Sequence, residues 1–229
     1  MTQGRQIHLF TDFCGELGKA GFSMGGNNAE GIFSLSACFG EDIAWHTGDR
    51  ERDPWEWRMR VLEETDWIAY AKLFFNKSGY LTREWAPYFL AVRRKGEHAG
   101  EAYRDGTLSE AAMRIHDLVE EHTSLPVHLI KSYGGFIGEG AVGFDRALTE
   151  LQMRMFLTMC GRRRKTSVKG EEYGWNSTVF CTTDAFYGSA VLEKADRTSL
   201  QEAREAIATQ VRRLNPEADE RKIKKFISG

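Results

Sequence analysis

Four consecutive basic residues, Arg162 to Lys165, form the strongest concentration of positive charge in the chain, and Lys169 follows closely. A guanidinium group suits phosphate because its planar fork is permanently charged and donates two parallel hydrogen bonds. Glu171 and Glu172 come next and offer the alternative of a salt-bridged hairpin. We favour the first interpretation, in which the basic run contacts the phosphates of a nucleic acid.

The segment before the basic run is predicted to be a helix that presents polar side chains to solvent. Its apolar stripe recurs at intervals of three and four residues and comprises Phe144, Leu148, Leu151 and Met155. The side chains then expected to face outward are Arg146, Thr149, Gln152, Met153 and Arg154. In a major groove, arginine reads guanine and glutamine reads adenine. A solvated polar face is the alternative, which Asp145 and Glu150 on the same helix favour.

The remaining reactive residue types show no spacing typical of a catalytic or metal site. The histidines at positions 46, 98, 116, 122 and 128 form no i, i+4 pair and no HExxH motif, so no zinc site is predicted. A GxSxG nucleophile motif is absent as well. We therefore predict no metal and no cofactor, and we assign no catalytic residue.

Six tryptophans are a high count for a chain of 229 residues. The simplest interpretation places four of them in the core, namely Trp55, Trp67, Trp85 and Trp175. Because Trp55 and Trp57 lie two apart on a predicted helix, one of this pair should be partly exposed. The alternative is a base-stacking or ligand pocket, with hydroxyl groups from Tyr80, Tyr88 and Tyr173.

The overall composition restricts where such a site can lie. A net charge of -2 excludes a chain coated in basic residues, so any nucleic-acid surface must be local. No apolar run approaches the roughly 18 residues of a membrane span, and the N-terminus has no secretory signal. The four cysteines are widely spaced, and we expect them to be reduced thiols. These features predict a cytoplasmic protein with no membrane partner.

The helix and turn signals predict an α+β, predominantly helical protein built around a winged helix-turn-helix at residues 107–182. Helices are expected at 109–121, 126–133 and 143–157, followed by a hairpin that turns at Lys169–Gly170. That hairpin should bring Cys160 and Cys181 close together. An N-terminal α+β region, residues 1–106, is expected to pack on this module, and residues 183–229 to form a C-terminal helical extension.

Within the N-terminal region the pattern is less regular. Short strands are expected at 32–39 and 43–46, where apolar residues alternate. Asp53 and Pro54 should begin a helix, because a capping side chain precedes proline at the first helical position. The helical pattern runs on to Phe75, with a break near residue 65.

Four strings carry a resemblance to a known family: DPWEWRMR (Asp53–Arg60), AYAKLFFNKSGYLTREWAPYFLAVRR (Ala69–Arg94), ELQMRMFLTMCG (Glu150–Gly161) and YGWNSTVF (Tyr173–Phe180). In these strings, over most of residues 45–190, the chain resembles the AlkZ-related family. These small bacterial proteins are partially similar to the winged-helix DNA glycosylases of the AlkZ family. The resemblance implies winged-helix architecture and binding to duplex DNA.

The chain departs from the glycosylases in the residues that do their chemistry. Those enzymes carry a Q-Φ-Q or Q-Φ-D pair that positions the attacking water, and they contain several winged-helix repeats. Here the nearest string is Gln6–Ile7–His8, which has histidine in the second polar position and is most simply a coincidence. The resemblance therefore implies the fold and a DNA partner, and it does not carry over glycosylase activity.

We therefore expect a winged-helix protein that binds double-stranded DNA and has no clear catalytic apparatus. The predicted DNA-contacting residues are Arg146, Thr149, Gln152, Arg154, Arg162, Arg163, Arg164, Lys165 and Lys169. Two alternatives stay open. One is a DNA-repair enzyme of the glycosylase type that acts on a damaged base, and the other is a protein-interaction module on a winged-helix scaffold. A steep salt dependence of DNA affinity would separate DNA binding from protein interaction.

Overall fold

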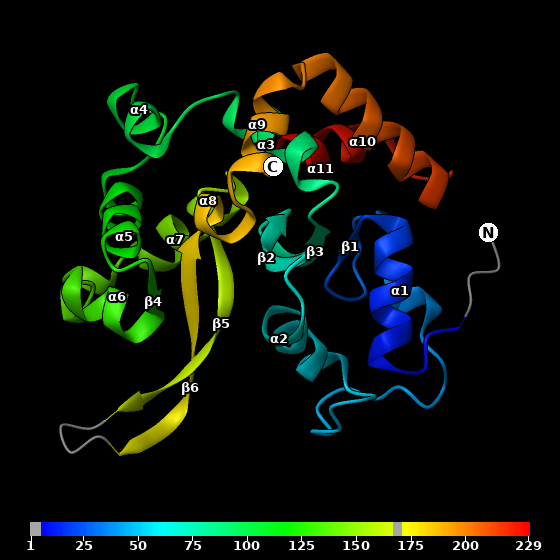
Figure 1. Ribbon diagram of the computed structural model, residues 1–229, viewed down its shortest axis with the longest axis horizontal. Helices are drawn as coiled ribbons and strands as arrows, with labels where there is room; N and C mark the ends of the chain where they lie inside the picture. The colour runs from blue at the N-terminus through cyan, green and yellow to red at the C-terminus, as the bar shows by residue number, and fades with distance from the viewer. Residues whose placement is uncertain (1–5, 167–170) are drawn as a thin grey trace.

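The computed structural model describes residues 6–166 and 171–229, and it is organised around one antiparallel sheet of six strands (Figure 1). The strand order is β1-β3-β2-β5-β6-β4. The strands are β1 (Phe22–Met24), β2 (Ile68–Phe74), β3 (Lys77–Thr82), β4 (Ser124–Pro126), β5 (Leu157–Thr166) and β6 (Glu172–Thr182). The N-terminal strands join the others where Tyr70 of β2 pairs with Met159 of β5. The α+β, largely helical fold class is thus confirmed.

Strand β2 is buried on both faces, which explains its misleading sequence pattern. Tyr70 and Ile68 pack with α1 (Phe10–Ala20) and α2 (Pro54–Glu64) in one core cluster, centred on the fully buried Trp57. Ala69, Ala71 and Leu73 point into a second cluster on the opposite face. A strand with apolar residues on both faces has no alternation, so its residues can be mistaken for the continuation of a helix. The predicted helical pattern to Phe75 is therefore wrong beyond Glu64.

The two short N-terminal strands predicted at 32–39 and 43–46 are also wrong. Residues Leu35–Cys38 form a single 3-10 turn, η1, because the Ser34 hydroxyl accepts a hydrogen bond from the amide of Ser36 and caps it. Residues 43–46 lie in a loop that ends at Asp53. By contrast, Asp53 caps α2 as predicted, by accepting a hydrogen bond from the amide of Trp55.

The C-terminal helices share a core with the N-terminal strands and cover one face of the sheet, at the upper end of the molecule in Figure 1. The helices on this side are α3 (Ala86–Arg94), α9 (Ser189–Arg197), α10 (Leu200–Leu214) and α11 (Glu220–Ser228). Hydrogen bonds from the buried guanidinium of Arg93 connect these helices to the rest of the chain. It donates hydrogen bonds to the carbonyl oxygens of Leu73, Met153, Phe226 and Ile227. The division of the chain into three domains stays a prediction.

A third core cluster holds the helices that precede the hairpin. They are α4 (Ala99–Arg104), α5 (Glu110–Glu121), α6 (Val127–Tyr133), the 3-10 turn η2 (Gly138–Ala141) and α7 (Phe144–Met153). The three predicted helices are confirmed, although α7 is shorter than expected because Met155 has a φ of 60° and β5 starts two residues later. A short helix, α8 (Thr183–Tyr187), follows the hairpin.

The order of elements from α5 onward is helix, strand, helix, helix, strand, strand, and β4 pairs with β6. The predicted antiparallel pairing of β5 with β6 is confirmed, while the turn at Lys169–Gly170 lies outside the described residues. Among the described helices, none combines the length and apolar character needed to cross a membrane.

Candidate nucleic-acid interface

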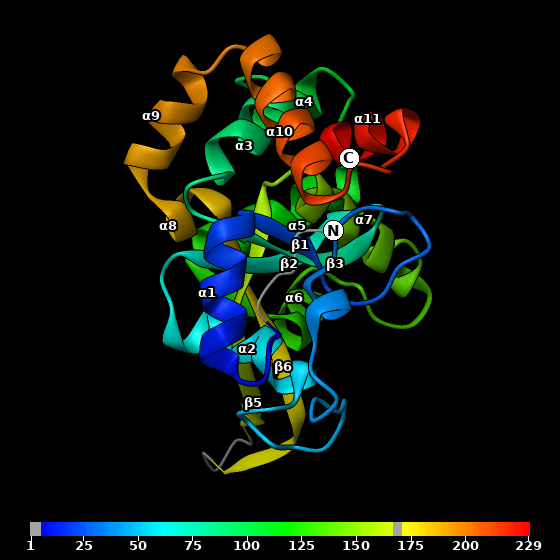
Figure 2. The same cartoon turned by 90° about the vertical axis from the view of Figure 1, so that its right-hand side faces the viewer.

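The β5–β6 hairpin projects beyond the helices and carries the basic run at its far end (Figures 1 and 2). Arg163, Arg164 and Lys165 are exposed, and none of them forms an ion pair with another described residue. Opposite them on β6 are two exposed aromatic residues, Tyr173 at 54% and Trp175 at 93% exposure. The hairpin therefore offers uncompensated cations beside aromatic rings.

The register of the β5–β6 pairing shifts between Arg163 and Lys165, and this shift leaves the two aromatic residues exposed. Arg163 pairs with Ser177, whereas Lys165 pairs with Tyr173, so three β6 residues lie opposite Arg164 alone. Gly174 supplies the positive φ, 70°, that such a bulge needs. The sequence prediction that Trp175 is a core residue is wrong, because this bulge turns the residue into solvent.

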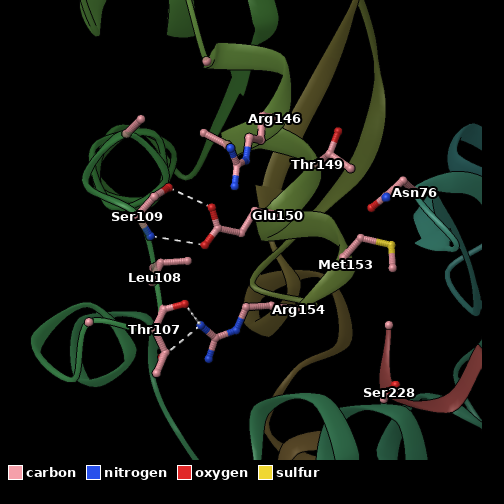
Figure 3. Close-up of a pocket in the computed structure, with 15 residues that line it drawn as sticks. Asn76, Thr107, Leu108, Ser109, Arg146, Thr149, Glu150, Met153, Arg154 and Ser228 are labelled. Atoms are coloured by element: carbon pink, nitrogen blue, oxygen red, sulfur yellow. Dashed lines mark hydrogen bonds between the residues drawn. The ribbon is translucent and has the colours of Figure 1, made fainter. Parts of the chain in front are cut away.

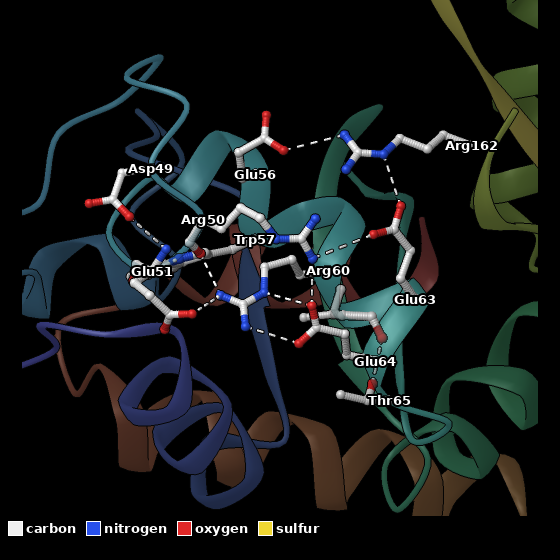
Figure 4. A network of polar contacts seen from close by, with 11 residues as sticks. Asp49, Arg50, Glu51, Glu56, Trp57, Arg60, Glu63, Glu64, Thr65 and Arg162 are labelled. Carbon is white, nitrogen blue, oxygen red and sulfur yellow. Dashed lines mark hydrogen bonds and ion pairs between the residues drawn. The ribbon is translucent and has the colours of Figure 1, made fainter. Parts of the chain in front are cut away.

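Arg162 differs from its three neighbours because it is held by carboxylates of α2 (Figure 4). Its Nε lies 2.8 Å from Glu63 and one terminal nitrogen lies 3.3 Å from Glu56, and its side chain is 25% exposed. Glu63 in turn approaches Arg50, which pairs with Glu64. Arg162 thus anchors the hairpin to α2, and its charge is already offset inside the protein.

Helix α6 packs against the base of the hairpin, and the positive charges of the hairpin affect the pKa of His128 on this helix. The amide of His128 donates to the Ser177 hydroxyl at 3.4 Å. Burial lowers the pKa of His128, and the nearby positive charges of Lys165 and Arg163 lower it further. Because side chains alternate along a strand, Arg163 and Lys165 lie on the α6 side of β5 and Arg164 on the α2 side.

On α7, the prediction that Gln152 faces solvent is wrong. Gln152 is only 1% exposed. Its side-chain oxygen accepts a hydrogen bond from the amide of Lys72, and its nitrogen donates to the carbonyl of Leu148. Met153 is also buried, in contrast to its expected exposure. Gln152 therefore satisfies a backbone group of β2 and is not available to a base.

The other polar residues of α7 line a groove of about 940 Å³ (Figure 3). Thr149 donates to the carbonyl of Asp145 and accepts a hydrogen bond from Lys72. Arg154 pairs with Glu97 and bonds the carbonyl of Thr107. Only Arg146, among the predicted contact residues of this helix, is exposed and without a hydrogen bond or ion pair in the described structure.

Other segments of the chain form the walls of this groove, so α7 is recessed between them. They include Asn76 in the β2–β3 turn, residues 106–109 before α5, and the C-terminal pair Ser228 and Gly229. Glu150, at the centre, accepts hydrogen bonds from the amide and the hydroxyl of Ser109 at 3.2 and 2.7 Å. The structure thus separates the two predicted halves of the interface: an exposed hairpin, and a helix largely occupied by contacts within the chain.

The remaining aromatic and polar candidates lie away from the hairpin tip. Trp57 is fully buried, and Trp55, predicted to be core, is 40% exposed, as the two-residue spacing allowed for one of the pair. The Trp55 ring lies under the guanidinium of Arg58, 3.2 Å from its centroid. In the Gln6–Ile7–His8 string, Ile7 is buried and bridges to Phe39, while His8 bonds Asp42 at the surface.

The two hairpin cysteines are neighbours, as predicted. Cys181 faces Thr158 across the strands, and Cys160 is the extra residue of a second bulge, between Met159 and Gly161. A hydrogen bond from Cys181 lowers the pKa of the Cys160 thiol, and Arg163 lowers it further. All four cysteines of the chain are free thiols.

These features define an α+β protein with a basic, aromatic hairpin that extends from a small helical unit. The chain belongs to the AlkZ-related family, whose family model matches residues 7–228. Among solved structures, it is similar to the Streptomyces sahachiroi DNA glycosylase AlkZ at 12% sequence identity, with a TM-score of 0.36. That match covers 76% of this chain and 50% of the other, so the chain spans about half the length of the glycosylase. A search of curated proteins gave no match.

Proposed function

We propose that residues 107–182 form a winged helix-turn-helix and that the protein binds duplex DNA, with the β5–β6 hairpin as its wing. The order α5–β4–α6–α7–β5–β6 supports this assignment, since it gives three helices and a three-stranded sheet that ends in a hairpin. Membership of the AlkZ-related family is consistent with it. The observation that carries the proposal is that Arg163, Arg164 and Lys165 are exposed and form no ion pair with any described residue.

The hairpin suits a DNA backbone because its cations lie on both faces of one strand. Arg163 and Lys165 lie on the α6 side and Arg164 on the opposite side, so the strand can neutralise phosphates on either side of it. Trp175 and Tyr173 add flat apolar surface next to these charges. Such surface contacts sugars or bases without reading sequence.

Helix α7 contributes less than a recognition helix usually does. Arg146 remains as its free cation, whereas Gln152, Thr149 and Arg154 are used within the fold. Contacts to phosphates position a protein on DNA but do not specify a sequence. We therefore propose binding that depends strongly on salt and weakly on base sequence, through Arg163, Arg164, Lys165 and Arg146.

The test is the affinity of the purified chain for a fluorescently labelled duplex, measured by anisotropy over a range of salt concentrations. We expect affinity at low salt that falls steeply as salt is added, and similar values for duplexes of unrelated sequence. A chain that shows no duplex affinity at low salt would refute the proposal and favour a protein partner for the hairpin. Strong preference for one sequence would refute the role given to phosphates.

A further inference from the structure

Three potential metal ligands lie together on α5. They are His116, Asp117 and Glu120, and one ligand atom from each lies within 4.8 Å of the other two. His116 and Glu120 are four residues apart, so their side chains project from the same face of the helix. A search of the sequence for histidine pairs alone misses this arrangement, because two of its three members are carboxylates.

The second observation is the state of the His116 ring. The residue is only 8% exposed, and neither ring nitrogen has a hydrogen-bond partner among the described residues. Its Nδ1 is completely enclosed. A buried polar atom without a partner destabilises the fold, and a bound ligand at this position would satisfy it. One of the two ring nitrogens lies within 4.8 Å of a carboxylate oxygen of Asp117 and of one of Glu120.

The surroundings favour a cation. Arg94 and Asp184 lie close enough to His116 to act on its charge. The guanidinium of Arg94 is paired with Asp184 at 2.6 Å and donates to the carbonyl of Met155, so its charge is compensated. The carboxylates of Asp117 and Glu120 are left without a compensating cation, because no ion pair joins either of them to a described residue.

We propose that His116, Asp117 and Glu120 bind a divalent transition-metal ion of the zinc type. One imidazole nitrogen with two carboxylate oxygens is a mixed donor set that suits zinc, whereas magnesium and calcium prefer oxygen alone. Tetrahedral ligands about 2.0–2.1 Å from zinc are about 3.3 Å apart. The buried histidine stays in place, and the two exposed carboxylates close on the ion by rotating. Three protein ligands leave one position for water or for a group of a partner molecule.

Calorimetric titration of the full, untagged chain with Zn²⁺ tests the site. Glu120→Gln removes one ligand from an exposed position, and Glu121→Gln is the matched control, because Glu121 is the adjacent exposed residue on the same helix. We expect Glu121→Gln to bind as the wild type does. Glu120→Gln should lose the site or weaken it by at least about tenfold, since even indirect changes around a metal site cost that much.

Zinc bound by the thiols is distinguished by its stoichiometry. Sites on cysteine persist in Glu120→Gln, whereas loss of the α5 site lowers the number of bound ions by one. His116→Gln should have the same effect, with circular dichroism confirming that the buried substitution leaves the helices folded. Equal zinc binding by the wild type, Glu120→Gln and His116→Gln would overturn the proposal, as would a wild-type chain that binds no zinc.

Discussion

Removal of single charges from the basic run should separate the hairpin residues that we propose contact DNA from Arg162, which is held within the protein. Arg163→Ala and Arg162→Ala remove the same group from adjacent positions on β5. Arg163 is exposed and forms no ion pair with a described residue, whereas Arg162 is held by Glu56 and Glu63 at 3.3 and 2.8 Å. To reach a phosphate, Arg162 would have to leave both carboxylates. We therefore expect the two substitutions to differ in their effect on DNA binding.

The size of the difference follows from counterion release. Each phosphate contact contributes about −0.9 to the slope of log affinity against log salt, so Arg163→Ala should reduce the steepness by about 0.9. The triple substitution of Arg163, Arg164 and Lys165 should reduce it by about 2.7. Between 50 and 200 mM salt, three such contacts account for a roughly 40-fold change in affinity. Arg162→Ala should leave the slope almost unchanged.

Fluorescence anisotropy with one labelled duplex at four or more salt concentrations measures these slopes. Thermal unfolding of each variant supplies the control, because Arg162→Ala leaves two carboxylates of α2 without their partner and should lower stability modestly. An Arg162→Ala variant that flattens the salt slope as much as Arg163→Ala would refute the separation of the two arginines. A triple variant with the wild-type slope would remove the hairpin from the interface.

Three further predictions concern stability. Gln152→Ala leaves the amide of Lys72 without a partner, and we expect chemical denaturation to show a loss of about 1–3 kcal/mol with no change in preference among DNA sequences. Trp175→Ala should change the unfolding free energy by no more than about 0.5 kcal/mol, whereas Trp57→Ala, at a fully buried position, should cost about 3–5 kcal/mol. For Asp53, burial raises the pKa, but hydrogen bonds from backbone amides outweigh it and the net pKa is lowered. Its carboxylate therefore stabilises the fold above its ordinary pKa of about 4, and this contribution is lost as the pH falls through the lowered value; Asp53→Asn should flatten the acid side of a stability curve measured from pH 7 to 3.

Elements with strong local signals could be predicted from the sequence. Asp53 with Pro54 fixes the start of α2, and Gly135 has a positive φ just after α6, where the predicted helix at 126–133 ends. In each case the capping side chain or the glycine acts on backbone groups only a few residues away. Such signals do not depend on the rest of the fold, so they are visible in a single sequence.

Elements set by distant partners could not be predicted. The apolar residues of β2 contact α1 and α2 on one face and the C-terminal helices on the other, and only the complete fold shows that both faces are covered. Arg162 is a similar case, because its carboxylate partners Glu56 and Glu63 lie about a hundred positions earlier. The sequence reveals the concentration of charge, and the fold decides which of those charges remain free.

The polar face of α7 shows why a recognition helix cannot be identified from periodicity alone. Spacing identifies the apolar stripe correctly, and it leaves every other side chain to be interpreted as exposed. Beyond Tyr70, however, β2 and β5 no longer pair, so the amide of Lys72 needs another partner. Gln152 supplies it, and this contact holds the Gln152 side chain in the interior, against β2. A polar residue on a helix is free to read a base only where the rest of the fold leaves it without a partner, and here the amide of Lys72 occupies Gln152. Among the described residues, Arg163, Arg164 and Lys165 have no ion-pair partner, and these cations therefore remain available.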